Sequence, residues 1–352
     1  MKIAYWGYLL VLGSSCLLVF SSIVENRADE VWGLVGDTGK VVVDEDPSCL
    51  DHGLCNKLLY LARYLSLAQA EVQSTDDIIV LPCFYGFGEQ HGRVYHVGSL
   101  FNIGALSSAL WADLRIRVVD SRLRRKVDRD GSLAVVRLHY NRTLLQRGPV
   151  TQALLKGLAP SIPLAEARAQ CAARVREQLG VGDYVAVHLR VERDFLAYCL
   201  KRERLTGQRH CFHASDVLPQ VTRSLPDTRR ILVIGDIASM AEEERVTALE
   251  GWPSGYRVVS TETLGCLSSR FRYIHRAAMD FFLALDASAF VGLTSSTFSN
   301  AVMSTRQLHR SRLRPSTPPH NYVYNCAKYH HERLVPVPDA RRRFYGPPCD
   351  GP

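Results

Sequence analysis

The chain has 352 residues, 47% of them hydrophobic, and carries a formal net charge of +8. This apolar content is enough for one large core or two of ordinary size, which excludes a disordered or fibrous protein. The basic clusters lack interleaved aromatic side chains, so we expect no nucleic-acid partner. Most of the charge is interpreted as solvated surface, and the functional alternative is attraction for a nucleotide diphosphate or an acidic glycan.

The N-terminus begins with a long apolar run. No charged residue occurs over residues 3–24, between Lys2 and Glu25. A helix of this length spans roughly 30 Å, the thickness of the hydrocarbon core of a bilayer. The run predicts a signal anchor within residues 1–30, and hence a single-pass type II protein of the Golgi or endoplasmic reticulum membrane with a lumenal body. A cleaved signal peptide is the alternative.

Two further features favour a secretory compartment. Asn141 begins an Asn-Arg-Thr glycosylation acceptor. The ten cysteines suit an oxidising compartment, and because Cys16 lies in the apolar run, at least one of the other nine has no partner. No two cysteines have the Cys-x-x-Cys spacing, so we expect no zinc site.

After the apolar run, the first predicted element is a helix that starts near Gly53. Leucines recur at helical spacing from Leu54 to Leu65, so one face of this helix packs inward. Residues 78–81 follow as a short apolar strand closed by Pro82. A strand after a helix indicates an α/β layer.

The second half of the chain repeats this alternation several times. We predict helices over residues 161–180, 240–250 and 273–287 and from residue 297, and strands over 184–189, 231–234, 256–259 and 290–293. Such alternation is typical of a doubly wound parallel sheet. With the N-terminal layer counted separately, the sequence predicts an α/β fold with two Rossmann-like domains, over residues 31–155 and 156–310, and an extended Pro- and Arg-rich tail over 311–352.

Charged residues cluster where one of these strands ends. Arg190 directly follows the strand over 184–189, and ligands of open α/β sheets bind beyond the carboxyl ends of the strands. An arginine offers a planar, permanently charged fork of donors that matches phosphate oxygens. The structural alternative is an ion pair that caps the strand.

Several segments resemble one family. "HLRVERDFLAYC" from His188 is similar to the His-Leu-Arg-x-Glu-x-Asp-x-Leu-Ala signature of plant-type protein O-fucosyltransferase-like proteins. "GLCNKLLYLARYLSLA" from Gly53 resembles the Gly-Leu-x-Asn-x-Leu start of GDP-fucose-using transferases. "LFNIGALSSALWADLRIRVV" and "AAMDFFLALDASAFVGLTSSTFSNAV" resemble the linking and late segments of the family. The resemblance extends over about residues 49–306.

This resemblance implies an inverting, metal-independent glycosyltransferase of the GT-B type, in which two Rossmann-like domains face a cleft. The donor would be GDP-fucose or a similar activated deoxy-sugar, the acceptor a hydroxyl group of a protein or glycan, and no cofactor would be needed. The implied catalytic residues are Arg190 at the diphosphate, Asn56 near the sugar, and Glu192. The implied donor-binding residues are Gly53, Leu54, His188, Asp194, Asp280 near the base or ribose, Ser296, Thr297 and Phe298.

The chemistry of this assignment is coherent. Cleavage of a sugar–diphosphate bond leaves negative charge on the β-phosphate, which a fixed arginine stabilises in the transition state. Glu192 either accepts the proton of the acceptor hydroxyl or pairs with a neighbouring arginine. Two Asp-x-Asp matches, at residues 44–46 and 128–130, follow no convincing core strand, so we interpret them as loop acids and expect no metal site.

The sequence leaves alternatives for the donor sugar and for the activity. A Ser-Ser-Thr-Phe turn at residues 295–298 replaces the Gly-Asn-Met turn usual in the family, which leaves fucose and rhamnose as alternative donor sugars. A catalytically silent glycan-binding relative is a further alternative, which retention of Asn56 and Arg190 disfavours. A sulfotransferase is disfavoured because the segment after Gly53 lacks the expected phosphosulfate loop.

Overall fold

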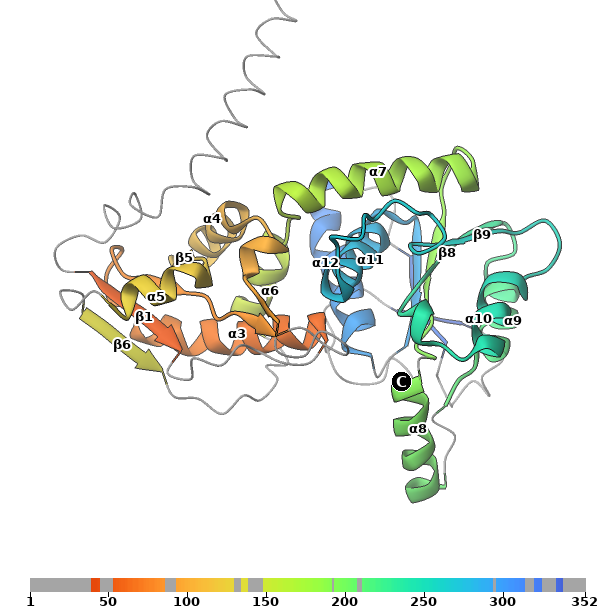
Figure 1. The fold of residues 1–352 in the computed structure, drawn as a ribbon, viewed down its shortest axis with the longest axis horizontal. Helices are drawn as coiled ribbons and strands as arrows, with labels where there is room; N and C mark the ends of the chain where they lie inside the picture. The colour runs from red at the N-terminus through yellow and green to blue at the C-terminus, as the bar shows by residue number, and fades with distance from the viewer. Residues whose placement is uncertain are drawn as a thin grey trace, which may run out of the picture.

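The computed structural model describes residues 39–44, 53–85, 93–129, 134–138, 148–191, 193–207, 211–293, 296–313, 320–324 and 334–337. Within them, two sheets lie beside each other, and helices pack around both (Figure 1). The predicted α/β fold with parallel sheets is confirmed.

The first sheet has four parallel strands in the order β5-β2-β1-β6. Val41, Val42 and Val43 of β1 are fully buried, as in a strand covered on both faces. The hydroxyl of Tyr64 lies 3.2 and 2.9 Å from the carbonyl oxygens of Val42 and Val80, which ties a helix to two strands. The strands are β1 (Lys40–Asp44), β2 (Ile78–Val80), β5 (Arg117–Val119) and β6 (Ala134–Leu138), and the associated helices are α3 (Leu54–Glu71), α4 (Ile103–Leu114) and α6 (Pro149–Gly157).

Short elements connect the parts of this half. Asp120 organises two of them, because its carboxylate accepts from the backbone N–H of Gly98 at 2.7 Å and of Arg122 at 2.9 Å. A Cβ at Gly98 would lie 2.2 Å from Asp120 Oδ2, so this approach requires glycine. The short elements are β3 (Phe84–Tyr85), β4 (Val94–Tyr95), η2 (Val97–Ser99), η3 (Ser121–Leu123) and α5 (Arg124–Val127).

The second sheet has the order β12-β11-β10-β7-β8-β9, and its strands are parallel except for the β11–β12 pair. Its strands are β7 (Val185–His188), β8 (Arg230–Ile234), β9 (Arg257–Ser260), β10 (Ala289–Gly292), β11 (His320–Val323) and β12 (Val335–Pro336). Its helices are α7 (Ile162–Leu179), α8 (Arg193–Thr206), α9 (Ala214–Ser224), η4 (Ile237–Ser239), α10 (Glu242–Glu250), α11 (Tyr273–Asp286) and α12 (Thr297–Leu313). The parallel order brings the carboxyl ends of β7 to β10 to one edge.

A buried arginine joins the two helices that precede and follow β10. Arg306 of α12 donates to the carbonyl oxygens of Ala284, Ala287 and Ser288, at 2.8, 2.6 and 3.1 Å. Its Nε donates to Asn321 Oδ1 of β11 at 3.0 Å. The bond to Ala284, with a further bond to the carbonyl oxygen of Leu285 at 3.2 Å, satisfies two of the last carbonyl groups of α11, and the bonds to Ala287 and Ser288 hold the residues that follow the helix. They fix α11 and α12, both of which carry site residues, against the sheet.

The two halves share packed apolar side chains. Phe101, which precedes α4, meets Phe282 of α11 edge to face with ring centroids 6.1 Å apart, and both rings are buried. A disulfide between Cys171 and Cys266 joins α7 to the segment between β9 and α11. The ring contact thus joins the first half to α11, and the disulfide holds the segment before α11 against α7.

Most elements predicted from the sequence are present within a few residues of their expected bounds. The predictions did not include β1, β5 and β6, nor the two strands that residues 320–323 and 335–336 add to the second sheet. The predicted domain boundary at 155/156 falls inside α6. The assignment of two domains, and of a GT-B arrangement, stays a prediction.

The localisation prediction is corrected. The apolar run over residues 3–24 and the glycosylation acceptor at Asn141 lie outside the described residues. In the part of the chain that is described, no helix has the length and apolar content to cross a bilayer. The described residues therefore do not support the predicted single-pass type II anchor in the Golgi or endoplasmic reticulum membrane.

Candidate functional site

A cavity of about 700 Å³ lies where the strands of the second sheet end and α3 of the first half begins. We call it the strand-end cavity. Ligands of parallel α/β sheets occupy this position because loops diverge there and leave space. Its lining residues are Gly53, Leu54, Cys55, Asn56, His188, Arg190, Phe195, Tyr198, Gly235, Asp236, Thr261, Glu262, Tyr273, Arg276, Ala277, Asp280, Ser296, Thr297 and Phe298.

Two long helices begin at this cavity. α3 starts after Gly53, which has an extended backbone and no capping side chain, and a Cβ placed on Gly53 would meet no atom of the described residues within 4 Å. α12 starts at Thr297, next to Ser296. The first N–H groups of a helix have no partner within it and carry partial positive charge. Both helix starts therefore favour an anion in the cavity.

Arg190 lies just beyond β7, with its guanidinium carbon 5.3 Å from the ring centroid of Phe195 on α8. Its backbone N–H donates to the hydroxyl of Tyr324 at 3.5 Å, and that hydroxyl donates to the carbonyl oxygen of His188 at 3.3 Å. Tyr324 thus holds the chain on both sides of the turn that leaves the strand. The cation–π contact limits the rotamers that the guanidinium adopts.

His188, at the end of β7, is buried and neutral. Its Nδ1 pairs with Ser299 Oγ at 2.8 Å, and its ring lies against Phe298 with centroids 4.7 Å apart. Burial, with a smaller effect of the Arg190 charge, lowers the pKa of His188 to about 3. Ser299 Oγ also accepts from the backbone N–H of Leu293 at 3.0 Å. His188 therefore couples the end of β7 to the start of α12.

Asp280 of α11 joins the loops after β8 and β9. Its carboxylate accepts from Thr261 Oγ1 at 2.7 Å and from the backbone N–H of Gly235 at 3.3 Å. Burial raises the pKa of Asp280 to about 7, and these two hydrogen bonds only partly offset it. The carboxylate is thus close to its titration point at neutral pH.

Two lining residues offer polar groups toward a ligand. The side-chain oxygen of Asn56, on the first turn of α3, is buried and has no hydrogen-bond partner among the described residues. Such an atom is costly unless a ligand or water supplies a donor. Arg276 of α11 brings a second guanidinium group, and none of the described residues pairs with it. Burial raises the pKa of nearby Glu262, while the charge of Arg276 opposes that shift.

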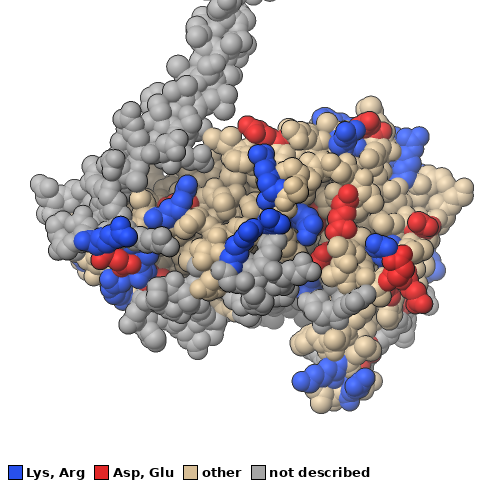
Figure 2. Space-filling model, viewed as in Figure 1, with Lys and Arg blue, Asp and Glu red and all other residues tan. Residues whose placement is uncertain are grey.

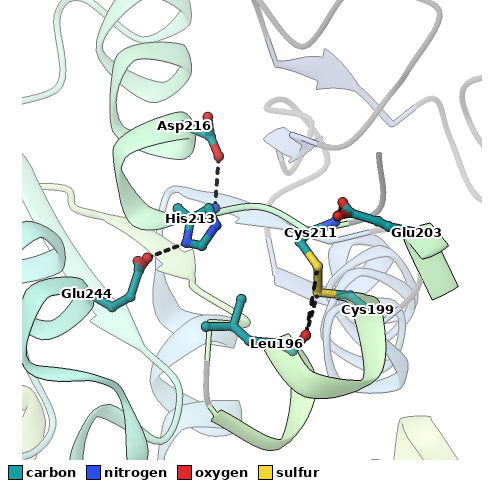
Figure 3. Close-up of a disulfide and its surroundings, with 7 residues drawn as sticks. All are labelled: Leu196, Cys199, Glu203, Cys211, His213, Asp216 and Glu244. Carbon is teal, nitrogen blue, oxygen red and sulfur yellow. Dashed lines mark hydrogen bonds and ion pairs between the residues drawn. A yellow bond between two sulfur atoms is a disulfide. The ribbon is translucent and has the colours of Figure 1, made fainter. Parts of the chain in front are cut away.

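α8 reaches the cavity with Phe195 and Tyr198 and is held by a disulfide (Figure 3). Cys199 of α8 bonds to Cys211, whose backbone N–H donates to Glu203 Oε1 at 2.7 Å. In Figure 1 the helix projects away from the body of the molecule. The disulfide therefore fixes the base of α8, where the two aromatic side chains lie.

The segment that follows Cys211 is anchored in turn to α10 (Figure 3). His213 Nδ1 pairs with Glu244, whose other carboxylate oxygen accepts from the backbone N–H of Ala214 at 2.8 Å. The backbone N–H of His213 donates to Asp216 at 2.9 Å, which completes the capping of α9. The disulfide is thus attached to a rigid part of the fold.

The structure brings together nearly all residues that the sequence singled out. Gly53, Leu54, Asn56, His188, Arg190, Asp280, Ser296, Thr297 and Phe298 line the strand-end cavity. Glu192 and the side chain of Asp194 lie outside the described residues. The functional roles assigned to these residues stay predictions.

Sequence reasoning missed several lining residues. Tyr273, Arg276, Ala277 and Asp280 recur at helical spacing, so the position of Asp280 gives a signal that finds Arg276. Gly235 and Asp236 directly follow a strand that was predicted, as Arg190 does. Phe195 and Tyr198 gave no such signal, because the loop geometry after β7 decides which side of α8 meets the cavity.

The interpretation of the Asp-x-Asp match at residues 44–46 as loop acids is corrected. Asp44 is buried and ends the core strand β1, whereas the sequence analysis placed the match at residues 44–46 away from a core strand. Asp46 and Asp130 lie outside the described residues. Within the described segments, no group of three or more His, Cys, Asp or Glu side chains is arranged to hold a metal ion.

The sequence of the chain is similar to that of a known protein. No protein-family model matches the chain. It is 30% identical over 153 residues to O-fucosyltransferase 23 of Arabidopsis thaliana, a match that covers 42% of this chain and 34% of that relative. The chain therefore spans about a third of the length of this curated relative.

Solved structures show the same fold. POFUT1 in complex with GDP-fucose superposes with a TM-score of 0.52 at 16% identity, over 82% of this chain and 98% of the other. POFUT1 in complex with GDP superposes with a TM-score of 0.51 at 15% identity, over 83% and 99%. The resemblance to O-fucosyltransferases, a group of glycosyltransferases, is confirmed, and the chain has the fold of POFUT1.

Proposed function

We propose that the chain is a glycosyltransferase that transfers fucose from GDP-fucose to a hydroxyl group of a protein or glycan acceptor. One observation carries the proposal: the Arg190 guanidinium and two helix N-termini meet in a single cavity at the carboxyl ends of parallel strands. This arrangement suits a diphosphate. The similar POFUT1 structures contain GDP and GDP-fucose, which supports GDP-fucose as the donor.

Arg190 supplies the main catalytic charge in this proposal. When the bond between the sugar C1 and the β-phosphate oxygen breaks, negative charge grows on that oxygen. A donor fixed beforehand stabilises the growing charge more than it stabilises the ground state, typically by about 3–4 kcal/mol. Phe195 and Tyr324 hold Arg190 in place, so little reorganisation accompanies the reaction.

Asn56 and Asp280 bind the two ends of the donor. The unpartnered Asn56 oxygen accepts a hydroxyl group of the sugar, which removes the cost of a buried orphan acceptor. Asp280 lies one helical turn beyond Arg276 and Ala277 and faces the base or ribose. His188 holds the start of α12 through Ser299 and so keeps Ser296, Thr297 and Phe298 in place at the phosphates.

The reaction inverts the sugar carbon. The acceptor oxygen forms its bond to C1 from the face opposite the diphosphate, GDP leaves with the electron pair of the broken bond, and the acceptor proton passes to a base. Glu192 is the proposed base, two residues beyond Arg190. The proposal is metal-independent, because Arg190 and the helix N-termini supply the positive charge at the diphosphate.

The test measures binding and hydrolysis of a panel of nucleotide sugars, namely GDP-fucose, GDP-mannose, UDP-glucose and UDP-rhamnose, by the purified chain. We expect GDP-fucose to bind at least about tenfold more tightly than the UDP-sugars and its turnover to continue in excess EDTA. Preference for UDP-rhamnose would assign a rhamnosyltransferase, binding without turnover would assign a silent relative, and Mn²⁺-restored turnover would refute the metal-independent mechanism.

A further inference from the structure

A second cavity, of about 420 Å³, lies among loops near the start of α11. We call it the loop cavity. Its lining includes His96, Ser99, Arg122, Ser161, Arg270 and His275. The first half of the molecule contributes His96 to Arg122, and the segment before α11 contributes Arg270 and Phe271. The assigned donor site uses none of these residues.

The first turns of α11 separate the two cavities. Tyr273, Arg276 and Ala277 face the strand-end cavity, whereas His275 faces the loop cavity. Adjacent residues of a helix point in directions about 100° apart, and a helix with its side chains is about 10–12 Å across. The loop cavity is therefore about one helix diameter from the proposed donor site, within reach of a molecule that reacts there.

The charged groups of the loop cavity are donors. The Nε of Arg122 donates a hydrogen bond to Asp120 Oδ1 at 3.2 Å. The two terminal nitrogens of Arg122 have no partner among the described residues. Arg270 is exposed, lies with its guanidinium carbon 5.0 Å from the Phe271 centroid and makes no described ion pair. Asp120 is buried, and its carboxylate accepts from the backbone N–H groups of Gly98 and Arg122 and lies 3.9 Å from His96 Nδ1.

The remaining lining groups add no competing negative charge. None of the lining residues is an Asp or a Glu. The hydroxyl groups of Ser99 and Ser161 already donate, to the carbonyl oxygens of His96 and Ser99. Figure 2 shows Lys and Arg side chains gathered near the middle of the displayed face, between the parts that Figure 1 labels α4 and α11. Guanidinium forks with open nitrogens match the two oxygens of a carboxylate group.

The volume of the loop cavity favours a compact ligand. Its volume lies within the range of about 300–1,000 Å³ that is typical of small-molecule sites. Peptides are often recognised by addition to a strand edge, and none of the lining residues belongs to a strand. We propose that the loop cavity binds an acidic sugar unit of the acceptor through Arg122 and Arg270. This proposal rests on the proposed function for its biological meaning and on the cavity for its chemistry.

The test titrates the whole chain with D-glucuronate, D-glucose and a triglutamate peptide, and measures each Kd by calorimetry or ligand-observed NMR. Glucuronate should bind at least about tenfold more tightly than glucose. The double variant Arg122→Gln/Arg270→Gln should lose at least about tenfold in glucuronate affinity. Arg129→Gln, at an exposed arginine that lines neither cavity, should leave glucuronate affinity unchanged.

GDP affinity, measured on the same variants, separates this inference from the proposed function. The double variant should keep wild-type GDP affinity, and saturating GDP should leave glucuronate affinity within about twofold. Equal binding of glucose and glucuronate, or full glucuronate affinity in the double variant, would overturn the inference whatever the GDP result. Tighter binding of triglutamate than of glucuronate would overturn the saccharide assignment. Absence of GDP binding with arginine-dependent glucuronate binding would refute the proposed function alone.

Discussion

The two cavities are built in different ways. The strand-end cavity is made from strand termini and helix starts, and its titratable groups His188 and Asp280 are buried, hydrogen-bonded and strongly shifted in pKa. The loop cavity is made from connecting segments, and its arginines are largely exposed. A buried, hydrogen-bonded polar group contributes both to folding stability and to ligand binding. An exposed charged group contributes little to folding stability, so its main effect is on the ligand. Changes at the buried groups of the first cavity should therefore affect both folding and chemistry, and changes at the exposed arginines of the second cavity should affect only binding.

Each cavity also has a disulfide of its own. Cys199–Cys211 holds α8, which brings Phe195 to the strand-end cavity. Cys171–Cys266 holds the segment that carries Arg270 and Phe271 into the loop cavity. The two disulfides close loops of very different sequence separation, 12 and 95 residues. They offer a matched pair of perturbations.

The largest effect is expected at Arg190. Arg190→Lys should lower kcat by about 100-fold or more, because an ammonium group does not reproduce the two-pronged contact with the leaving diphosphate. Thermal stability should change little, since the guanidinium is partly exposed. Measurement of kcat, donor Kd and Tm on the variant separates the two effects.

Arg129→Lys is the control for Arg190→Lys, because Arg129 is exposed and lines neither cavity. Its kcat should equal that of the wild type. A near-normal kcat in Arg190→Lys, with the loss confined to Tm, would show that Arg190 only caps the strand and would remove the catalytic role.

Removal of the disulfides should give the next largest effects. One variant should lose more stability and glucuronate affinity, and the other should lose more donor affinity. Cys171→Ser/Cys266→Ser should lower the free energy of unfolding by about 4–5 kcal/mol, because the long loop gains more entropy in the unfolded chain. It should also weaken glucuronate binding, because the segment that carries Arg270 is no longer held in place. Cys199→Ser/Cys211→Ser should lower the free energy of unfolding by about 3 kcal/mol and raise the donor Kd by about tenfold. Urea unfolding and titration of both ligands measure the four effects.

Each double serine variant serves as the control for the other. Equal effects of both variants on donor and glucuronate affinity would contradict the separate roles of the two disulfides.

A pH experiment addresses Asp280. Between the ordinary pKa of 3.8 and the folded-state pKa of about 7, the folded chain holds a proton that the unfolded chain releases. The free energy of unfolding contributed by this group therefore falls as pH rises through that window. Asp280→Asn does not titrate, so the Tm of the wild type relative to the variant should fall by roughly 5 °C between pH 4.5 and 7.5. A constant difference in Tm across that range would refute the assigned pKa.

The smallest effect is expected at Tyr324. Its hydroxyl contacts the backbone on both sides of Leu189 with long hydrogen bonds of 3.3 and 3.5 Å. Tyr324→Phe should cost about 1 kcal/mol of folding free energy and lower kcat by about threefold, through looser placement of Arg190. If donor Kd rose while kcat stayed constant, Tyr324 would act on binding alone. The Arg122→Gln variant, which lines the other cavity, is the comparison and should retain kcat for a neutral acceptor.

The sequence by itself determined the repeating strand and helix pattern of the second half. Apolar runs such as residues 231–234 alternate with amphipathic segments, and local composition suffices for this pattern. The sequence also pointed to Arg190, because a charged residue directly after a buried strand lies at the ligand edge of a parallel sheet. The start of α3 at Gly53 and the turn before α12 were likewise visible in the chain.

Only the tertiary structure decided which residues meet. β1, β5 and β6 are short, and they are strands because neighbours far along the chain pair with them: Val42 pairs with Ile79 and Val136. Phe195 reaches Arg190 because a disulfide formed with Cys211 sets the position of α8. The loop cavity exists because Arg122 and Arg270, 148 positions apart, are brought together by packing between the two halves. Such contacts depend on distances that local patterns do not encode, and so they require the folded chain.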